Sequence, residues 1–143
     1  MAVACFALGA GVSSSQVLMP QTRMSSCPAS PNCVSSEAEA DDELHRIDPF
    51  EVGIDAADVW SRVRAGVEAI PRTRIVTATD DRLHAECRSL IFGFVDDLEL
   101  VWRPANRRID VRSASRTGHW DLGVNRRRVE RLRARLRIDG VIR

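Results

Sequence analysis

A chain of 143 residues with 44% hydrophobic and 29% charged residues has room for one domain with a buried core. The formal net charge of +1 argues against a protein that binds nucleic acid over a broad surface. All 21 basic residues are arginine, a bias that we attribute to a GC-rich genome, so the arginine count alone is no sign of phosphate binding.

The first 26 residues are expected to lie outside the folded domain, as an apolar export or anchor remnant or as a disordered segment. Residues 1–12 are too short to span a membrane, and they lack the positively charged start of a secretory signal. Residues 2–5 end at Cys5 and have the small side chains that precede a lipid-modified cysteine. The sequence therefore predicts either the remainder of a longer export signal or a translation start near Met24.

Residues 27–45 are expected to form a linker that is rich in cysteine, proline and serine and then becomes acidic. Cys27 and Cys33 flank a turn-prone stretch that contains Pro28 and Pro31. A disulfide between them is reasonable in an oxidising compartment, and two free thiols are the alternative. Neither these cysteines nor the histidines of the chain have the spacing of a metal site, so no metal is expected.

The folded domain is expected over residues 46–143 and begins with a helix. Asp55 is a candidate N-cap, and Pro71 ends an apolar pattern with the period of a helix, formed by Val59, Val63, Val67 and Ile70. A second helix is expected from about residue 122 to residue 137, with an apolar stripe formed by Val129, Leu132 and Leu136.

Four strand patterns lie between the helices, at residues 74–79, 82–92, 94–103 and 107–115. Turn residues separate them at hairpin length, so the strands should pair antiparallel as a meander. Two amphipathic helices can cover one face of such a sheet. The sequence therefore predicts an α+β fold of order helix, four-stranded antiparallel meander, helix, arranged as a two-layer sandwich.

One charged residue, Asp96, falls on the apolar side of the third strand pattern, where it alternates with Phe94, Leu98, Leu100 and Trp102. Burial of an ionised carboxylate is costly without a partner, so Asp96 needs an ion pair unless a bulge turns it outward. The candidate partners on or just beyond the neighbouring strands are Arg88, Arg112 and Arg116. We take Arg88 and Asp96 as the candidate buried ion-pair residues.

Residues 112–128 combine hydroxyl groups, arginines and glycines at the change from strand to helix. Exposed backbone N–H groups and cationic side chains at such a junction can hold an anion. The candidate anion site consists of Arg112, Ser113, Ser115, Arg116, Asp121, Asn125 and Arg126. In the alternative interpretation, which we favour, Asp121 caps the last helix, the glycines permit a tight turn, and an arginine neutralises Asp96.

Charge is distributed unevenly along the chain. Residues 37–58 carry nine acids and one arginine, whereas residues 126–143 carry eight arginines and two acids. The basic end can have an anionic partner, such as nucleic acid or a membrane surface, or the two ends can attract each other within one chain or a dimer. We favour a solvated arginine face, because the apolar stripe of the last helix should pack on the sheet.

No combination of residues predicts a reaction. Asp96 and Asp97 cannot form a catalytic pair within one strand, because adjacent strand residues point to opposite faces. His84 shares a strand face with Glu86 and Arg88, an arrangement more typical of a polar sheet surface than of an acid–base pair. The sequence has no nucleophile elbow, phosphate loop or dinucleotide-binding motif, so we expect no cofactor and no catalytic residues.

Three motifs carry a resemblance to a known family, at residues 27–36, at residues 83–97, and at residues 112–116 with 121–128. In this order they resemble domain-of-unknown-function family 1499, which occurs in proteobacteria, cyanobacteria and plastids. The likeness covers residues 27 to about 137, and Cys87 departs from the apolar, often aromatic residue expected at its position. The resemblance implies no established reaction, cofactor or substrate. Because plastid relatives look like thylakoid-lumen proteins and many bacterial ones look exported or membrane-anchored, it favours an oxidising compartment and a Cys27–Cys33 disulfide.

We therefore expect a small extracytoplasmic or membrane-associated domain that acts as a non-catalytic accessory or binding module. One alternative is an enzyme that acts on an anionic small molecule held by Arg112, Arg116 and Arg126. Another is a carrier of lipid or another small ligand, with a cavity between the sheet and the last helix. The expected partner is an anionic small molecule or a protein, with peripheral membrane association left open and nucleic acid excluded.

Overall fold

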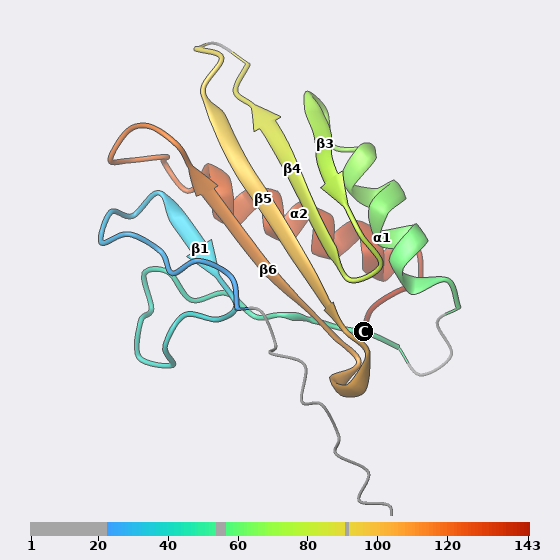
Figure 1. Ribbon diagram of the computed structural model, residues 1–143. Helices are drawn as coiled ribbons and strands as arrows, with labels where there is room; N and C mark the ends of the chain where they lie inside the picture. Colours follow the sequence, from blue (N-terminus) through green and yellow to red (C-terminus); the bar gives the residue numbers. More distant parts are fainter. Residues whose placement is uncertain (1–22, 54–56, 91) are drawn as a thin grey trace, which may run out of the picture.

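The computed structural model describes residues 23–53, 57–90 and 92–143. The chain has an α+β fold with one antiparallel sheet of six strands and two helices (Figure 1). Most of the expected N-terminal remnant, and the candidate N-cap Asp55, lie outside the described residues. The expected fold class is confirmed at the level of an antiparallel α+β domain, whose sheet has more strands than the four that were expected.

The sheet is built from strands that pair antiparallel with their neighbours. The strands are β1 (Cys33–Ser35), β2 (Phe50–Glu51), β3 (Thr73–Ala78), β4 (Arg82–Arg88), β5 (Val95–Arg103) and β6 (Arg108–Ser115), with a short 3-10 helix, η1 (Pro104–Asn106), between the last two. Their order is β1-β6-β5-β4-β3, and β2 pairs with the beginning of β6 while β1 pairs with its end. Strand β6 therefore joins the N-terminal segment to the rest of the sheet.

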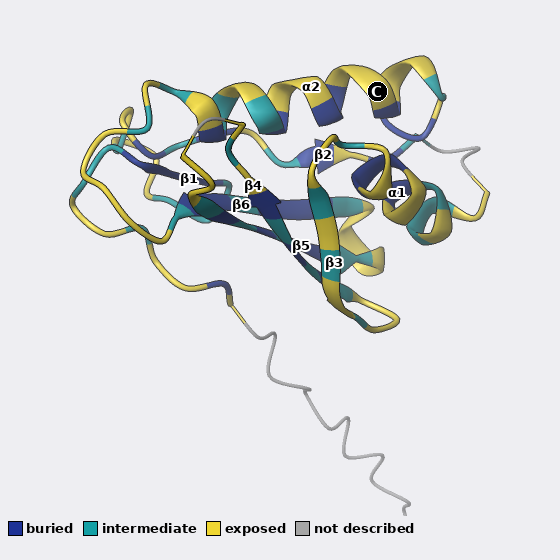
Figure 2. Ribbon diagram, turned by 90° about the horizontal axis from the view of Figure 1, so that it is seen from above, coloured by how far each residue is buried: buried dark blue, intermediate teal, exposed yellow. Residues whose placement is uncertain are grey.

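Both helices, α1 (Val59–Glu68) and α2 (Val124–Ile138), lie over one face of the sheet (Figure 2). No described helix covers the opposite face, which is called the open face below. Alternate strand residues point to the helices and form the core with the expected stripe of α2, including Leu83, Leu98, Leu100, Ile109, Val111, Val129, Leu132 and Leu136. Burial of each large side chain contributes about 1.5–3 kcal/mol, which holds the helices on the sheet. Among the described residues, no helix is both long enough and apolar enough to cross a membrane.

The segment that was expected to be a linker contributes to the sheet. Strand β1 lies within residues 27–45 and pairs with β6, and its Val34 is buried in the core. Phe50 in β2 is also fully buried. Strands of two or three residues are too short for an alternating pattern to be visible in the sequence, which is why neither was expected.

Strand β4 ends at Arg88, earlier than the predicted strand, which continued to residue 92. The connection to β5 is closed by two hydrogen bonds: the Ser89 N–H donates to the Phe94 carbonyl at 2.9 Å, and the Phe94 N–H donates to the Ser89 hydroxyl at 3.0 Å. Gly93 adopts a φ of 65°, in the left-handed region that favours glycine. The apolar residues of this stretch therefore lie in a connection between strands.

Candidate functional site

The seven residues of the predicted anion site do not form one pocket, because the sheet separates them. Ser113 points to the helices and is fully buried, whereas its neighbour Arg112 points to the open face and donates to Glu99 at 2.8 Å. Arg116 also reaches residues of the open face, namely Asp97 and Glu86. Arg112 and Arg116 therefore lie on the open face, whereas the Ser113 and Ser115 hydroxyl groups bind Asn125 on the helix side.

On the helix side, Asn125 of α2 is the centre of a buried hydrogen-bond network. Its side-chain oxygen accepts from the Ser113 hydroxyl at 2.7 Å and from Arg128 at 2.6 Å. Its side-chain nitrogen has three acceptors within 3.0 Å, which are the Asn32 carbonyl, the Ser115 hydroxyl and the Asp121 carboxylate. Because every polar group of Asn125 is used, this network ties the β1 segment, β6 and α2 together.

Asp121 is held at the N-terminus of α2. Its carboxylate accepts hydrogen bonds from the backbone N–H groups of Gly123 and Asn125, both at 2.8 Å. Gly123 precedes the helix with a φ of 75°, which its lack of a Cβ permits. The carboxylate therefore satisfies free N–H groups of the first turn and balances the positive end of the helix dipole.

Asp96 is 5% exposed and pairs with Arg128 of α2. This partner differs from the predicted ones, Arg88, Arg112 and Arg116, which lie on or just beyond the neighbouring strands. Arg88, proposed as the other member of the pair, has an exposed side chain 3.8 Å from Glu86. Asp96 lies opposite Ser115 and Cys87 on the helix side of the sheet, so an arginine that reaches it must come from a helix.

The open face carries a charge-balanced network centred on Arg116. Its guanidinium donates to Asp97 at 2.7 and 2.9 Å and to Glu86 at 2.9 Å, and His84 Nε2 lies 2.7 Å from Asp97. Hydrogen bonding to Arg116 lowers the pKa of Asp97, and Arg74 with Arg116 lowers the pKa of Glu86. A shallow recess of about 490 Å³ overlies part of this network. Its carboxylates already neutralise Arg116, which leaves that arginine little capacity for an external anion.

Two arginines of α2 hold the backbone of the acidic N-terminal segment. Arg126 donates to the carbonyls of Leu44 and Arg46 at 3.0 and 2.9 Å. Arg133 donates to the carbonyls of residues 48 and 49, and its guanidinium lies 4.7 Å from the centroid of the Phe50 ring. The acidic and basic ends of the chain therefore lie together within one molecule. In these contacts the two arginines bind backbone carbonyl groups of the acidic segment and not its carboxylates.

A second recess, of about 460 Å³, lies between the end of α1, the end of β4 and α2, and is called the helix recess below. Its walls include the apolar residues Ile70, Pro71, Leu90, Val124 and Leu132. Five arginines also line it: Arg72, Arg88, Arg128, Arg131 and Arg135. No acidic residue is among its described lining residues. It is therefore both apolar and positively charged.

The arginines of the helix recess differ in how they are used. Arg128 is committed to Asp96, Arg135 pairs with Asp139 at 2.9 Å, and Arg72 donates to the carbonyl of Arg88. Arg131 is exposed, and it makes no hydrogen bond or ion pair with any residue that the structure describes. Arg131 is thus the cation of this recess with the most capacity for an external partner.

A buried thiol lies in the same recess. Cys87 is 2% exposed, and the Thr73 hydroxyl donates to its sulfur at 3.3 Å. Burial raises the pKa of this thiol, so it is held in the neutral form. Cys87 therefore behaves as the small apolar residue that its place in a strand suggested.

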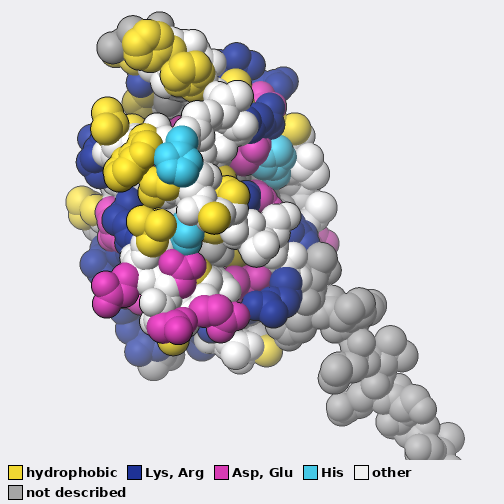
Figure 3. All heavy atoms as spheres, turned by 90° about the vertical axis from the view of Figure 1, so that its left-hand side faces the viewer, with side chains coloured by type: hydrophobic (Ala, Val, Ile, Leu, Met, Phe, Trp, Pro, Cys, Tyr) yellow, Lys and Arg dark blue, Asp and Glu magenta, His cyan; other side chains and the backbone are white. Residues whose placement is uncertain are grey.

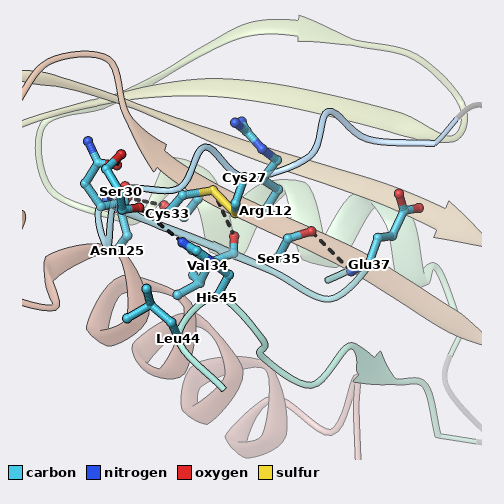
Figure 4. The surroundings of a disulfide bond; sticks show 12 residues. Cys27, Ser30, Cys33, Val34, Ser35, Glu37, Leu44, His45, Arg112 and Asn125 are labelled. Atoms are coloured by element: carbon cyan, nitrogen blue, oxygen red, sulfur yellow. Dashed lines mark hydrogen bonds between the residues drawn. A yellow bond between two sulfur atoms is a disulfide. The ribbon is translucent and has the colours of Figure 1, made fainter. Parts of the chain in front are cut away.

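The sulfur atoms of Cys27 and Cys33 lie 2.05 Å apart, at the distance of a disulfide bond (Figure 4). This bond ties the residues before β1 to the edge of the sheet, beside Arg112. The enclosed loop is also held by His45, whose Nε2 lies 3.1 Å from the Ser30 carbonyl and whose Nδ1 lies 2.8 Å from Asp42. Among the described residues, no group of three or more His, Cys, Asp or Glu side chains could hold a metal ion.

The chain belongs to the DUF1499 family of proteins of unknown function, whose family model matches residues 23–136. This confirms the resemblance that the three sequence motifs carried. No curated protein and no solved structure matches the chain significantly. The family assignment therefore brings no reaction or ligand with it.

Proposed function

We propose that this chain is a non-catalytic binding domain and that it holds a small amphiphilic anion in the helix recess. The observation that carries the proposal is the lining of this recess, which combines an apolar wall with five arginines and has no described acidic residue. Ligand pockets of a few hundred Å³ with apolar walls and a few convergent polar groups suit small molecules. A molecule with an apolar part and a carboxylate or phosphate group matches this lining.

The two parts of the ligand have separate places in the recess. The apolar part contacts Ile70, Pro71 and Leu90, which lie at the end of α1 and after β4. The anionic group pairs with Arg131, whose guanidinium has no partner among the described residues. Charge-assisted hydrogen bonds of this type are stronger than neutral ones, so Arg131 should contribute strongly to affinity.

Two observations favour a binding role over catalysis. The enzyme alternative needs Arg112, Arg116 and Arg126 in one place, but they bind Glu99, Asp97 and backbone carbonyls of the 44–46 segment at different positions. Burial also keeps the Cys87 thiol neutral, and a neutral thiol is a poor nucleophile. The carrier alternative, by contrast, agrees with a recess that lies between the sheet and α2.

The Cys27–Cys33 bond supports an extracytoplasmic location for this binding domain. Disulfides persist in oxidising compartments and are rare in the cytosol. The family resemblance pointed in the same direction.

Calorimetric titration of the protein with decanoate tests the proposed function. Two comparison probes each lack one feature of decanoate: decanol lacks the charge, and sulfate lacks the apolar tail. We expect decanoate to bind, and decanol and sulfate to bind at least about tenfold more weakly, because each lacks one of the two sets of contacts. Arg131→Gln should weaken decanoate binding by about tenfold, whereas Arg82→Gln, at the opposite end of β4, should leave it unchanged. Equal affinity of the two variants would refute the assignment of the anion to Arg131.

A further inference from the structure

One end of the sheet carries two connections with exposed, large apolar side chains. The β4–β5 connection contributes Leu90, Phe92 and Phe94, and the β6–α2 connection contributes Trp120 and Leu122. These five residues, called the apolar loop end below, are between 53% and 80% exposed. Both connections follow the ends of strands that flank the start of β5, so they lie at the same end of the molecule.

This concentration is unusual for a surface in contact with water. The described part of the chain exposes nine large hydrophobic residues, and outside the apolar loop end and the adjacent Val124 only Leu44, Val76 and Ile138 remain. The Phe92 and Phe94 rings stack with their centroids 5.5 Å apart, so the tip of the β4–β5 connection presents a stacked aromatic pair. Clustered exposed apolar side chains of this type mark an interaction surface.

Arginine side chains lie beside the apolar loop end. Arg127 donates to the Leu122 carbonyl at 2.7 Å, and Arg88 and Arg131 line the helix recess together with Leu90. The one acid within these two connections, Asp121, is already bound to N–H groups of α2. Figure 3 shows hydrophobic side chains gathered over the upper part of its view and most of the visible acidic side chains over the lower part.

We propose that the apolar loop end inserts into the interface of an anionic lipid bilayer. Trp, Phe and Leu are the residue types that enter the boundary between headgroups and acyl chains, and arginines beside them attract anionic headgroups. The β4–β5 connection extends beyond the end of the sheet (Figure 1), a shape that suits insertion into a soft interface. The acidic residues nearest this end, Asp121, Asp96 and Asp97, are bound to N–H groups of α2 or paired with Arg128 and Arg116, which limits their repulsion of the same lipids.

This docking is independent of the ligand proposed for the helix recess, although the two are compatible. Leu90 belongs to the apolar loop end and to the wall of the recess. A docked domain would therefore open its recess beside the bilayer surface. Binding of decanoate and binding of vesicles can each fail without the other, because one is measured without lipid and the other without ligand.

Co-sedimentation of the full chain with vesicles tests the proposal. We expect binding to vesicles of phosphatidylglycerol with phosphatidylcholine and much weaker binding to phosphatidylcholine alone. The double variant Phe92→Ser with Trp120→Ser should lose about tenfold or more in partitioning, because two large side chains no longer leave water. Arg127→Gln should lose about fivefold, the factor for one cation near an anionic surface. Ile138→Ser and Arg82→Gln, which remove an exposed apolar residue and an arginine elsewhere, should bind as the unchanged chain does.

A second measurement locates the contact on the molecule. Trp120 fluorescence should shift to shorter wavelength when anionic vesicles are added, and the shift should disappear in Trp120→Phe, which keeps an apolar side chain and should still bind. Vesicle binding without this shift would overturn the proposal, because another part of the chain would then make the contact. Equal partitioning of the double variant and of Ile138→Ser into vesicles would also overturn the proposal. So would a chain that does not bind vesicles but self-associates in solution, if the double variant abolishes that self-association.

Discussion

Replacement of Asp96 by alanine tests the buried pair that links β5 to α2. The Asp96 and Arg128 side chains are 7% and 10% exposed, so Asp96→Ala leaves a buried guanidinium without its counter-charge. Removal of one partner of a buried ion pair costs about 3–5 kcal/mol. Arg128 keeps its bonds to Ser113 and Asn125, so we expect the lower end of this range, about 3 kcal/mol. For a domain of this size that corresponds to a fall in Tm of roughly 10 °C.

Urea unfolding of the variants gives the free energy directly. Glu68→Ala is the matched control, because the Glu68–Arg64 pair is about half exposed and should be worth less than about 1 kcal/mol. The double variant Asp96→Ala with Arg128→Met removes both charges and should be more stable than Asp96→Ala alone. A loss of less than about 1 kcal/mol for Asp96→Ala would refute the argument that this pair is buried and coupled.

Three further expectations follow from the same contacts. Because Arg116 lowers the pKa of Asp97 in the folded protein, the Asp97 carboxylate stabilises the fold above about pH 4 and loses that contribution as the pH falls through the lowered pKa. Arg116→Gln should therefore reduce the loss of stability at acid pH in urea unfolding, and an unchanged pH profile would contradict this. Thiol titration of the unfolded, unreduced protein should find Cys27 and Cys33 unreactive, and reduction should cost about 2 kcal/mol of stability; free thiols at both positions would contradict the bond. Asn125→Leu should cost more than about 2 kcal/mol in urea unfolding, because its buried partners lose their hydrogen bonds, and a neutral effect would show that the network is dispensable.

The sequence was most informative where a residue conflicted with its local pattern. Asp96 interrupts an apolar strand face, and burial cost alone indicated that it needs a cation. The identity of that cation depends on how α2 crosses the sheet, which no local pattern contains. Arg128 lies within residues 112–128, the segment of the candidate anion site, but strand adjacency alone predicts Arg88, Arg112 or Arg116 as the partner.

Part of the sheet, and the features on which the two proposals rest, were not predicted from the sequence, for different reasons. Strands β1 and β2 are too short to show a period, so the N-terminal part of the sheet was not expected. Leu90 and Phe92 continue the apolar run of β4, which made the strand pattern too long; Gly93 was the signal that a connection begins earlier. Arg131 looked like any arginine on a solvated helix face, and only the tertiary packing of α1 against α2 places it beside an apolar recess.

The assignment of the ligand to the helix recess is tested most directly by amide chemical-shift mapping of the isotope-labelled protein during titration with decanoate. We predict that the largest shifts fall on residues that line the helix recess, such as Leu90, Val124 and Arg131. Shifts confined to the open face, around His84 and Arg116, would contradict the account and move the binding site to the charge-balanced side of the sheet.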